Sequence, residues 1–175
     1  ALLSPQLYEN EQQKGYTPFL DSLMRQSYTF FNMYSNGKRS IQALPAIWSS
    51  IPSLKTSFIS MPQAMAPMNA LPELLSNEGY RTMFFCGSNH GSMGFGAYAR
   101  QVGVKELYSR ENYEQIHGKD DFDGYWGIWD EKFIGYMGEE LQKCSEPFFA
   151  TIFTLTSHHP FVIPQEYEGK LPEGL

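Results

Sequence analysis

Hydrophobic positions along the chain follow two alternating patterns, helical spacing and short continuous runs. Helical spacing and helix caps predict helices after Thr17-Pro18, from about Ser40 through Trp48, over residues 71–78, through residues 97–102 and from Asp130. β-Prone runs predict strands over residues 27–34, 80–86 and 148–155. The stretch 51–69, rich in Pro, Ser and Met, predicts an irregular connection, and the polar stretch 109–123 predicts a loop.

The alternation of these elements predicts an α/β fold in which a mainly parallel sheet is sandwiched between helices. Residues 148–155 form the clearest strand, and their continuous apolar run is typical of a central parallel strand covered on both faces. We expect one domain over residues 1–175. In such sheets, ligands bind at the carboxyl ends of the strands.

Composition narrows the functional classes. The chain has 175 residues, of which 42% are hydrophobic and only 18% are charged, a composition that argues against a disordered chain. A formal net charge of −6 without a basic run argues against nucleic-acid binding. No apolar window is long enough to span a bilayer, and no signal segment opens the chain. Cys86 and Cys144 lack metal or redox spacing, and either two free thiols or one disulfide is compatible with the sequence.

The residues around Ser40 place a hydroxyl group where a predicted strand gives way to a helix. The turn signal Asn36-Gly37 precedes it. Near a helix N-terminus, unpaired N–H groups favour phosphate or sulfate esters. Spacing alone favours the simpler interpretation, in which Ser40 is the N-cap of the helix. Lys38 and Arg39 either steady an anionic ester or are solvated turn residues.

Two further segments follow predicted strands and should reach the same rim of the sheet. In the glycine-rich loop 87–94, His90 either donates to an oxyanion or belongs to a flexible turn. In the segment 156–161, His158 and His159 either serve an anion, a metal or a proton transfer, or are satisfied by backbone and water. These residues do not supply the full set of ligands that a metal site requires.

Aromatic and acidic residues gather in the stretch 123–130. Trp126 either walls a pocket for a polar head group or is a core anchor, and Asp130 is expected to cap the helix that follows.

Several of these segments, taken in order, resemble one known family. The residues are Gly15 to Leu23, Asn36 to Ser40, Gly79 to Thr82, Tyr125 to Asp130 and Thr154 to Phe161. Together they resemble the lipoteichoic acid synthase and phosphoglycerol transferase branch of the alkaline phosphatase/sulfatase superfamily. The resemblance covers nearly the whole chain.

The resemblance implies roles for individual residues. Ser40 stands where the family has a serine or threonine nucleophile that also binds a divalent ion such as manganese, magnesium or zinc. His158 falls on the family's substrate-side histidine, and His90, Lys38, Arg39 and Trp126 are further candidates for substrate contacts. Where the lipoteichoic acid enzymes place a tryptophan and an arginine near glycerol phosphate, this chain has Met93 and Phe95. A different head group or a sulfate ester is therefore compatible with the sequence.

The resemblance also implies elements outside this chain. The family's metal-binding glutamate and its aspartate–histidine pair fall beyond residues 1–175, so we expect an incomplete metal site and a sheet incomplete at both ends. The chain would be the central part of a membrane-anchored enzyme whose catalytic domain faces the periplasm or the extracellular side. Its unpaired sheet edges would favour self-association.

The sequence and the resemblance together give three candidate functions. The first is metal-dependent transfer or hydrolysis of phosphate or sulfate esters, on a lipid or glycan head group, through a covalent ester on Ser40. The second is a non-catalytic binding or structural domain. A serine hydrolase of carboxylic esters lacks support, because no Gly-x-Ser-x-Gly elbow surrounds Ser40.

Overall fold

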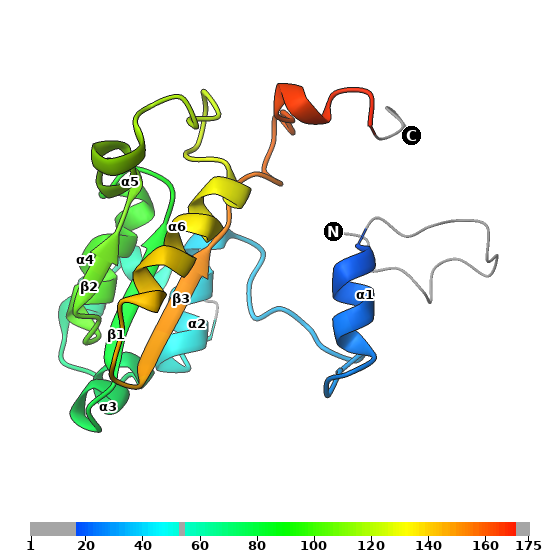
Figure 1. Cartoon of the computed structure of the whole chain (residues 1–175). Helices are drawn as coiled ribbons and strands as arrows, with labels where there is room; N and C mark the ends of the chain where they lie inside the picture. Colours follow the sequence, from blue (N-terminus) through cyan, green and yellow to red (C-terminus); the bar gives the residue numbers. More distant parts are fainter. Residues whose placement is uncertain (1–16, 53–54, 171–175) are drawn as a thin grey trace. The chain divides into compact units, whose positions relative to one another are not determined.

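The computed structural model describes residues 17–52 and 55–170. The chain divides into two units, residues 1–35 and residues 36–175, and each is described by itself. In the first unit, α1 (Pro18–Met24) confirms the predicted helix, drawn in blue in Figure 1. The Thr17 hydroxyl donates a hydrogen bond to the Asp21 carboxylate at 3.2 Å across its first turn. The expectation of a single domain stays a prediction.

The predicted strand over residues 27–34 is wrong. This segment contains no strand, and its aromatic side chains are exposed, with Tyr28 99% and Tyr34 89% accessible. An extended segment is stable as a strand only when a neighbour pairs with its backbone N–H and C=O groups. None of the three strands in the described part of the chain pairs with it.

The second unit is built on a parallel sheet of three strands in the order β2-β1-β3. The strands are β1 (Arg81–Cys86), β2 (Glu106–Tyr108) and β3 (Phe148–Phe153). β1 pairs with β3 from Arg81 opposite Phe148 to Cys86 opposite Phe153. The predicted α/β fold with a parallel sheet is therefore confirmed.

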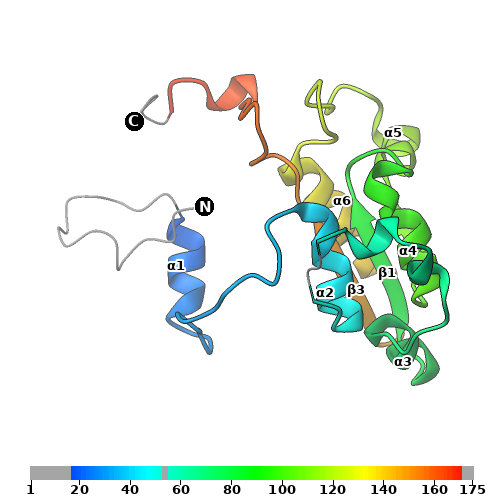
Figure 2. The same ribbon diagram turned by 180° about the vertical axis from the view of Figure 1, so that it is seen from behind.

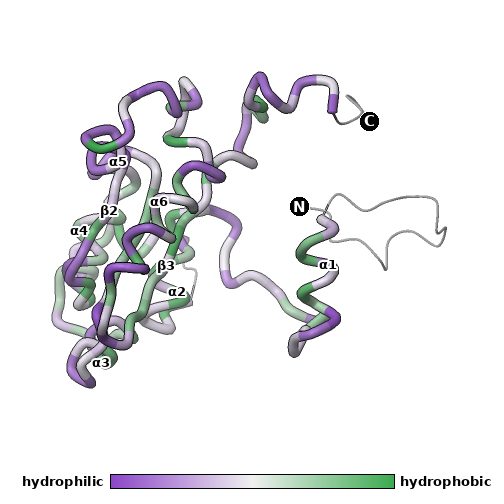
Figure 3. The backbone as a smooth tube through the Cα atoms, in the orientation of Figure 1, coloured by the Kyte–Doolittle hydropathy of each residue, from purple (hydrophilic) through white to green (hydrophobic). Residues whose placement is uncertain are grey.

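Helices cover both faces of this sheet, and each face packs its own hydrophobic cluster, because successive side chains of a strand point to opposite faces. One cluster contains Phe84 and lies against α2 (Ala43–Ser49) and α4 (Phe95–Gln101). The other contains Phe85 and lies against α5 (Arg110–His117) and α6 (Asp130–Gln142). Figures 1 and 2 show α6 and α2 on opposite sides of β1 and β3. In Figure 3 β1 and β3 are largely hydrophobic, whereas the segment after α5 is mostly hydrophilic.

The position of β3 differs from the prediction. β1, not β3, is the central strand, and all but the first of its residues are buried, whereas those of β3 are half-buried or exposed. The outer edge of β3 has no partner among residues 17–52 and 55–170. Such an edge favours pairing with another chain, so the expected self-association stays a prediction.

The loop expected over residues 109–123 is also partly wrong, because α5 occupies its first half. Ser109 is the N-cap residue of this helix, and its backbone N–H donates a hydrogen bond to the Asn112 side chain at 2.9 Å. Tyr113 is its buried contact with the core, and the other helix residues are polar or exposed. One buried side chain in a polar stretch is too weak a periodic signal to find from sequence.

The remaining predictions of regular structure hold. α3 (Leu71–Asn77) ends before Gly79, which has a positive φ of 84°. The connection 51–69 contains only short 3-10 turns in its described part, Phe58–Ser60 and Pro62–Met65. Other 3-10 turns are Ser40–Gln42, Ser92–Gly94 and Gln165–Tyr167.

The two cysteines are free. Cys86 contacts Ser88 at the carboxyl end of β1, and Cys144 accepts a hydrogen bond from Arg81 at the amino end of the same strand. Five residues of strand separate these ends by roughly 16 Å. A disulfide, which requires Cα atoms within about 7 Å of each other, is excluded in this fold.

Candidate active site

Ser40 is the first residue of a 3-10 turn that leads directly into α2. The expectation that Ser40 is the N-cap is wrong, because that position belongs to Arg39. The turn is closed by Gln42, whose side-chain oxygen accepts hydrogen bonds from the backbone N–H groups of Lys38 at 3.0 Å and Arg39 at 3.1 Å. Because Gln42 closes the turn, the Ser40 hydroxyl does not serve as the cap, and its side chain is half-buried.

α2 is anchored to the sheet and so fixes the position of Ser40. Leu44 and Trp48 are each 2% exposed and pack in the cluster with Phe84. The Trp48 indole N–H donates to the Thr151 hydroxyl of β3 at 3.3 Å. The hydroxyl of Ser40 is therefore carried on a turn that leads into a helix whose apolar face is buried against the sheet.

The loop before α6 is organised by the Asp123 carboxylate. Its Oδ1 accepts hydrogen bonds from the backbone N–H groups of Tyr125, Trp126 and Gly127, at 2.8, 2.8 and 3.0 Å. Such turns are a preferred use of aspartate in loops. Gly127 is required for close approach, because a Cβ atom there would collide with the carbonyl group of Gly87.

Asp130 joins this loop to the segment that follows β3. Its carboxylate accepts hydrogen bonds from the backbone N–H groups of Leu155 at 2.7 Å and Thr156 at 3.0 Å. The Thr156 hydroxyl in turn accepts the Asp130 N–H at 2.8 Å. The expectation that Asp130 caps α6 is therefore wrong: Trp129 is the N-cap residue, and the Asp130 carboxylate holds the chain at the carboxyl end of β3.

His158 lies in the exposed turn beyond this link. Its Nδ1 lies 2.8 Å from the carbonyl oxygen of His159, and because a carbonyl oxygen only accepts, Nδ1 is the donor. In the neutral ring, Nε2 then carries the free lone pair. The Trp126 indole packs against this imidazole, with 4.2 Å between ring centroids, and its N–H donates to the same carbonyl oxygen at 2.7 Å.

These segments meet at a cavity of about 170 Å³. Three of the predicted site residues, Ser40, Trp126 and His158, line it together. The glycine-rich loop contributes Met93, a non-glycine residue with a positive φ of 51°. Further lining residues that the sequence did not single out come from the end of β3 and the segment after it: Phe153, Thr154, Leu155 and Ser157. Their sequence signals were their places at the end of the predicted strand 148–155 and in the segment Thr154 to Phe161 that carries the family resemblance.

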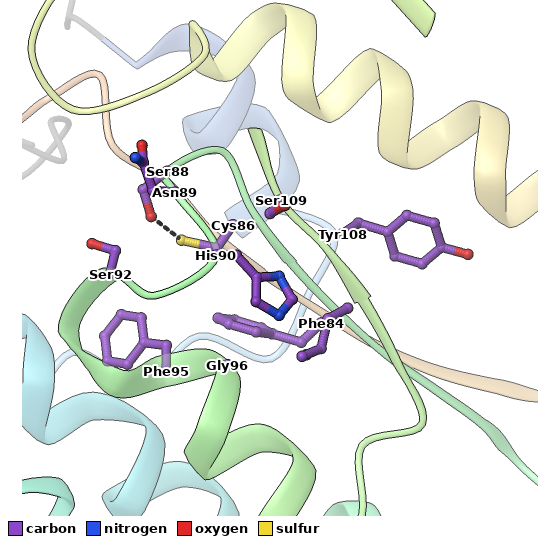
Figure 4. Close-up of a pocket in the computed structure, with 11 residues that line it drawn as sticks. Phe84, Cys86, Ser88, Asn89, His90, Ser92, Phe95, Gly96, Tyr108 and Ser109 are labelled. Atoms are coloured by element: carbon purple, nitrogen blue, oxygen red, sulfur yellow. Dashed lines mark hydrogen bonds between the residues drawn. The ribbon is translucent and has the colours of Figure 1, made fainter. Parts of the chain in front are cut away.

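The other predicted site residues do not line this cavity. Lys38 and Arg39 are exposed beside Ser40, and their backbone N–H groups bind Gln42. His90 lies in a separate cavity of about 20 Å³ between β1, α4 and β2, where Figure 4 shows it with Phe84 and Cys86. That volume is about the size of one water molecule, too small for an ester.

Contacts with distant residues hold His90 in this second cavity. The Arg100 guanidinium lies 2.9 Å from His90 Nε2, and the Glu111 carboxylate accepts the His90 backbone N–H at 3.1 Å. Burial raises the pKa of the Cys86 thiol nearby, and the contact with Ser88 opposes this only in part. A neutral thiol and a cavity of this size point to packing at this place in the fold.

Comparison with known proteins decides the family. The sulfatase family model matches residues 4–174. The chain belongs to the sulfatase family. It is 25% identical over 169 residues to the lipoteichoic acid synthase-like protein YvgJ of Bacillus subtilis, a match that covers 91% of this chain and 26% of that protein. It is 22% identical to lipoteichoic acid synthase 2 of the same organism, over 92% of this chain and 25% of that protein.

Two solved structures share the fold of this sulfatase-family chain. A protein of the alkaline phosphatase superfamily from Vibrio parahaemolyticus superposes with a TM-score of 0.77 at 27% identity, over 88% of this chain and 37% of that one. The lipoteichoic acid synthase LtaP from Listeria monocytogenes superposes with a TM-score of 0.74 at 24% identity, over 89% and 38%. The chain thus spans about a quarter of the length of the curated relatives.

The donor set of this sulfatase-family chain does not by itself fit the divalent ion that the family implies. Ser40 offers one oxygen ligand, but the described residues contain no group of three or more His, Cys, Asp or Glu side chains placed to hold a metal. A divalent ion in such sites takes four or more ligands. In the same part of the chain, no helix is both long and apolar enough to cross a membrane.

Proposed function

We propose that this chain carries the nucleophile and the substrate-side histidine of an enzyme that transfers or hydrolyses phosphate or sulfate esters. The observation that carries the proposal is the cavity shared by Ser40 and His158, which are 118 positions apart in the sequence. Membership of the sulfatase family and likeness to lipoteichoic acid synthases support the ester class. The envelope location and the membrane anchor implied by the resemblance stay predictions.

Ser40 is the proposed nucleophile. Its hydroxyl loses a proton, Oγ forms a bond to the phosphorus or sulfur atom of the ester, and the bond from that atom to the leaving alcohol oxygen breaks. The leaving oxygen takes up a proton. A second hydroxyl group, from a lipid, a sugar or water, then attacks the serine ester, loses its own proton and releases Ser40 with its proton restored.

His158 is the proposed substrate-side group. When protonated, its Nε2 donates a hydrogen bond to an ester oxygen and stabilises the negative charge that develops there. When neutral, the same atom accepts the proton of the incoming hydroxyl. The bond from Nδ1 to the His159 carbonyl oxygen keeps Nε2 available for both roles.

The proposed divalent ion would use Ser40 as one ligand and would require further ligands from outside the described residues, so no step is assigned to it. The described residues lack a group of three or more His, Cys, Asp or Glu side chains that could hold a metal, and this supports one alternative to the enzyme: a binding domain that uses the same cavity without chemistry. Turnover of phosphate or sulfate esters by the full protein distinguishes the enzyme, which requires it, from the binding domain, which does not.

The test compares two serines that line the same cavity, Ser40 and Ser157. In the full protein, Ser40→Ala should lower turnover of phosphate or sulfate esters by at least ~10³-fold, because the nucleophile is lost. Ser157→Ala should stay within about tenfold of the wild type, because it removes one neutral hydrogen-bonding group. Wild-type turnover in Ser40→Ala would overturn the proposal, whereas a full protein that binds phosphate or sulfate esters without turning them over would leave the binding function.

A further inference from the structure

The indole of Trp126 and the imidazole of His158 share one acceptor, the carbonyl oxygen of His159. We propose that Trp126 is a positioning residue, which fixes the tautomer and orientation of His158 through this carbonyl group and through contact between the two rings. The importance of this arrangement for turnover rests on the proposed function, whereas the arrangement itself does not.

The hydrogen-bond geometry carries the first step. Trp126 Nε1 lies 2.7 Å and His158 Nδ1 lies 2.8 Å from the His159 oxygen. A carbonyl oxygen has two lone pairs and accepts both bonds, so the two donors do not exclude each other. The tautomer of a neutral histidine is set by the partner of one ring nitrogen, which here is a carbonyl oxygen facing Nδ1.

The second step concerns the other hydrogen bonds around this carbonyl group. His158, His159 and Phe161 are all exposed. The turn's backbone bonds, from His158 N–H to the Leu155 oxygen and from Phe161 N–H to the His158 oxygen, leave the His159 oxygen to side-chain donors. The indole N–H and the imidazole Nδ1–H are the two side-chain donors that bind this oxygen, so the indole fixes the oxygen in the position where it accepts the imidazole proton.

The third step is that the backbone of Trp126 is itself fixed by contacts with the rest of the fold. The Asp123 carboxylate binds the backbone N–H groups of Trp126 and Gly127, and Gly127 packs against Gly87 at the end of β1. The indole thus connects the strand end to the exposed turn. Its N–H donates to the protein, so the N–H is not free to bind a ligand in the cavity that Trp126 lines, and the substrate contact expected from the sequence stays a prediction.

The test measures the His158 tautomer in the full protein labelled with ¹⁵N-histidine, using the ring nitrogen shifts in NMR spectra above the pH at which histidine titrates. The wild type should show the Nδ1–H form. Trp126→Phe keeps an aromatic ring but removes the donor, and should give a mixture of both tautomers. Trp129→Phe is the matched control, because Trp129 lies in the same loop but outside the cavity lining, and it should leave the tautomer unchanged.

Kinetics supply the second readout. Trp126→Phe should lower kcat by about 10- to 100-fold, the usual cost of losing a supporting hydrogen bond behind a functional histidine, and should leave KM within about twofold. An unchanged tautomer with a raised KM and an unchanged kcat would overturn the inference and make the indole a direct substrate contact.

Two outcomes keep this inference separate from the proposed function. An Nε2–H tautomer in the wild type overturns it even if Trp126→Phe does not fold. If Ser40→Ala retains turnover while Trp126→Phe still shifts the tautomer, the proposed function fails and the positioning role stands.

Discussion

The two ends of the sheet both carry polar clusters, and they differ in whether the polar groups satisfy one another. At the amino end, the Arg81 guanidinium on β1 binds the Glu106 carboxylate on β2, with Nη2 and Oε2 2.7 Å apart, and Tyr108 donates to the same carboxylate at 2.8 Å. At the carboxyl end, Ser40 and His158 face a cavity of about 170 Å³. The amino-end cluster is closed, whereas the carboxyl end leaves room for a ligand.

Perturbed pKa values show why this difference matters. The hydrogen bond from Arg81 lowers the pKa of Glu106, although burial opposes the shift. Burial, together with the bond to Glu106, raises the pKa of Tyr108. Such shifts often mark functional sites. Here the cluster's own pairing and burial explain them, so the shape of the cavity is the better guide to function.

After the loss expected for Ser40→Ala, the largest expected effect separates the two adjacent histidines at the carboxyl end. His158→Gln should lower kcat/KM of the full protein by about 10²- to 10³-fold, because a group that binds the developing charge is lost. His159→Gln should stay within about threefold, since its side chain does not line the cavity. Steady-state kinetics with an unchanged melting temperature check this, and equal losses in both variants would remove the assigned role from His158.

The next effect tests the link that holds the carboxyl end together. Asp130→Ala should lower the free energy of unfolding by about 2–3 kcal/mol, because the Leu155 and Thr156 N–H groups lose a charged acceptor. Asp120→Ala, at an exposed position, should cost less than about 0.5 kcal/mol. Urea unfolding measures both, and a small cost for Asp130→Ala would show that the link is dispensable.

At the amino end the expected effect is smaller and concerns stability alone. Glu106→Gln should cost about 1 kcal/mol, because the pair with Arg81 is partly exposed. Turnover should match the wild type, since the cluster lies at the opposite end of β1 from the cavity. A loss of turnover without a loss of stability would contradict the contrast between the two ends.

The smallest effect is a dependence on pH. Because the folded-state pKa of Glu106 lies below its ordinary value, its contribution is fully present above the unfolded-state pKa of about 4.3. It is lost as pH falls through the lower, folded-state value. The difference in unfolding free energy between wild type and Glu106→Gln should therefore shrink below about pH 4.3. A difference that grows on acidification would reverse the assigned sign.

The strand runs show how far the sequence predicts the fold. The stretches 80–86 and 148–155 are both apolar and β-prone, and both form parallel strands. Their order in the sheet depends on which neighbours pair with them, and a run of apolar residues does not encode this. The same dependence on partners explains two further differences. β2 is short but pairs with β1, whereas the longer β-prone segment 27–34 has no partner in this sheet and forms no strand.

The candidate site was predictable where position along the strands decides it. His158 follows β3 and lines the cavity as this logic predicts, whereas Ser40 reaches the same cavity through the turn before α2, because the strand expected before it is absent. His90 follows β1 by the same logic but turns away, because Arg100 and Glu111, distant in sequence, bind it. The shared acceptor of Trp126 and His158 depends on side-chain directions that spacing does not specify.

The most direct test of the central claim is to identify the residue that carries the covalent ester. The full protein, turned over on a phosphate or sulfate ester and quenched in acid, is digested and analysed by mass spectrometry. We predict a phosphoryl or sulfuryl adduct on Ser40, absent from Ser40→Ala. An adduct on Ser157 or His158, or turnover with no adduct under conditions that trap the intermediate, would contradict the account.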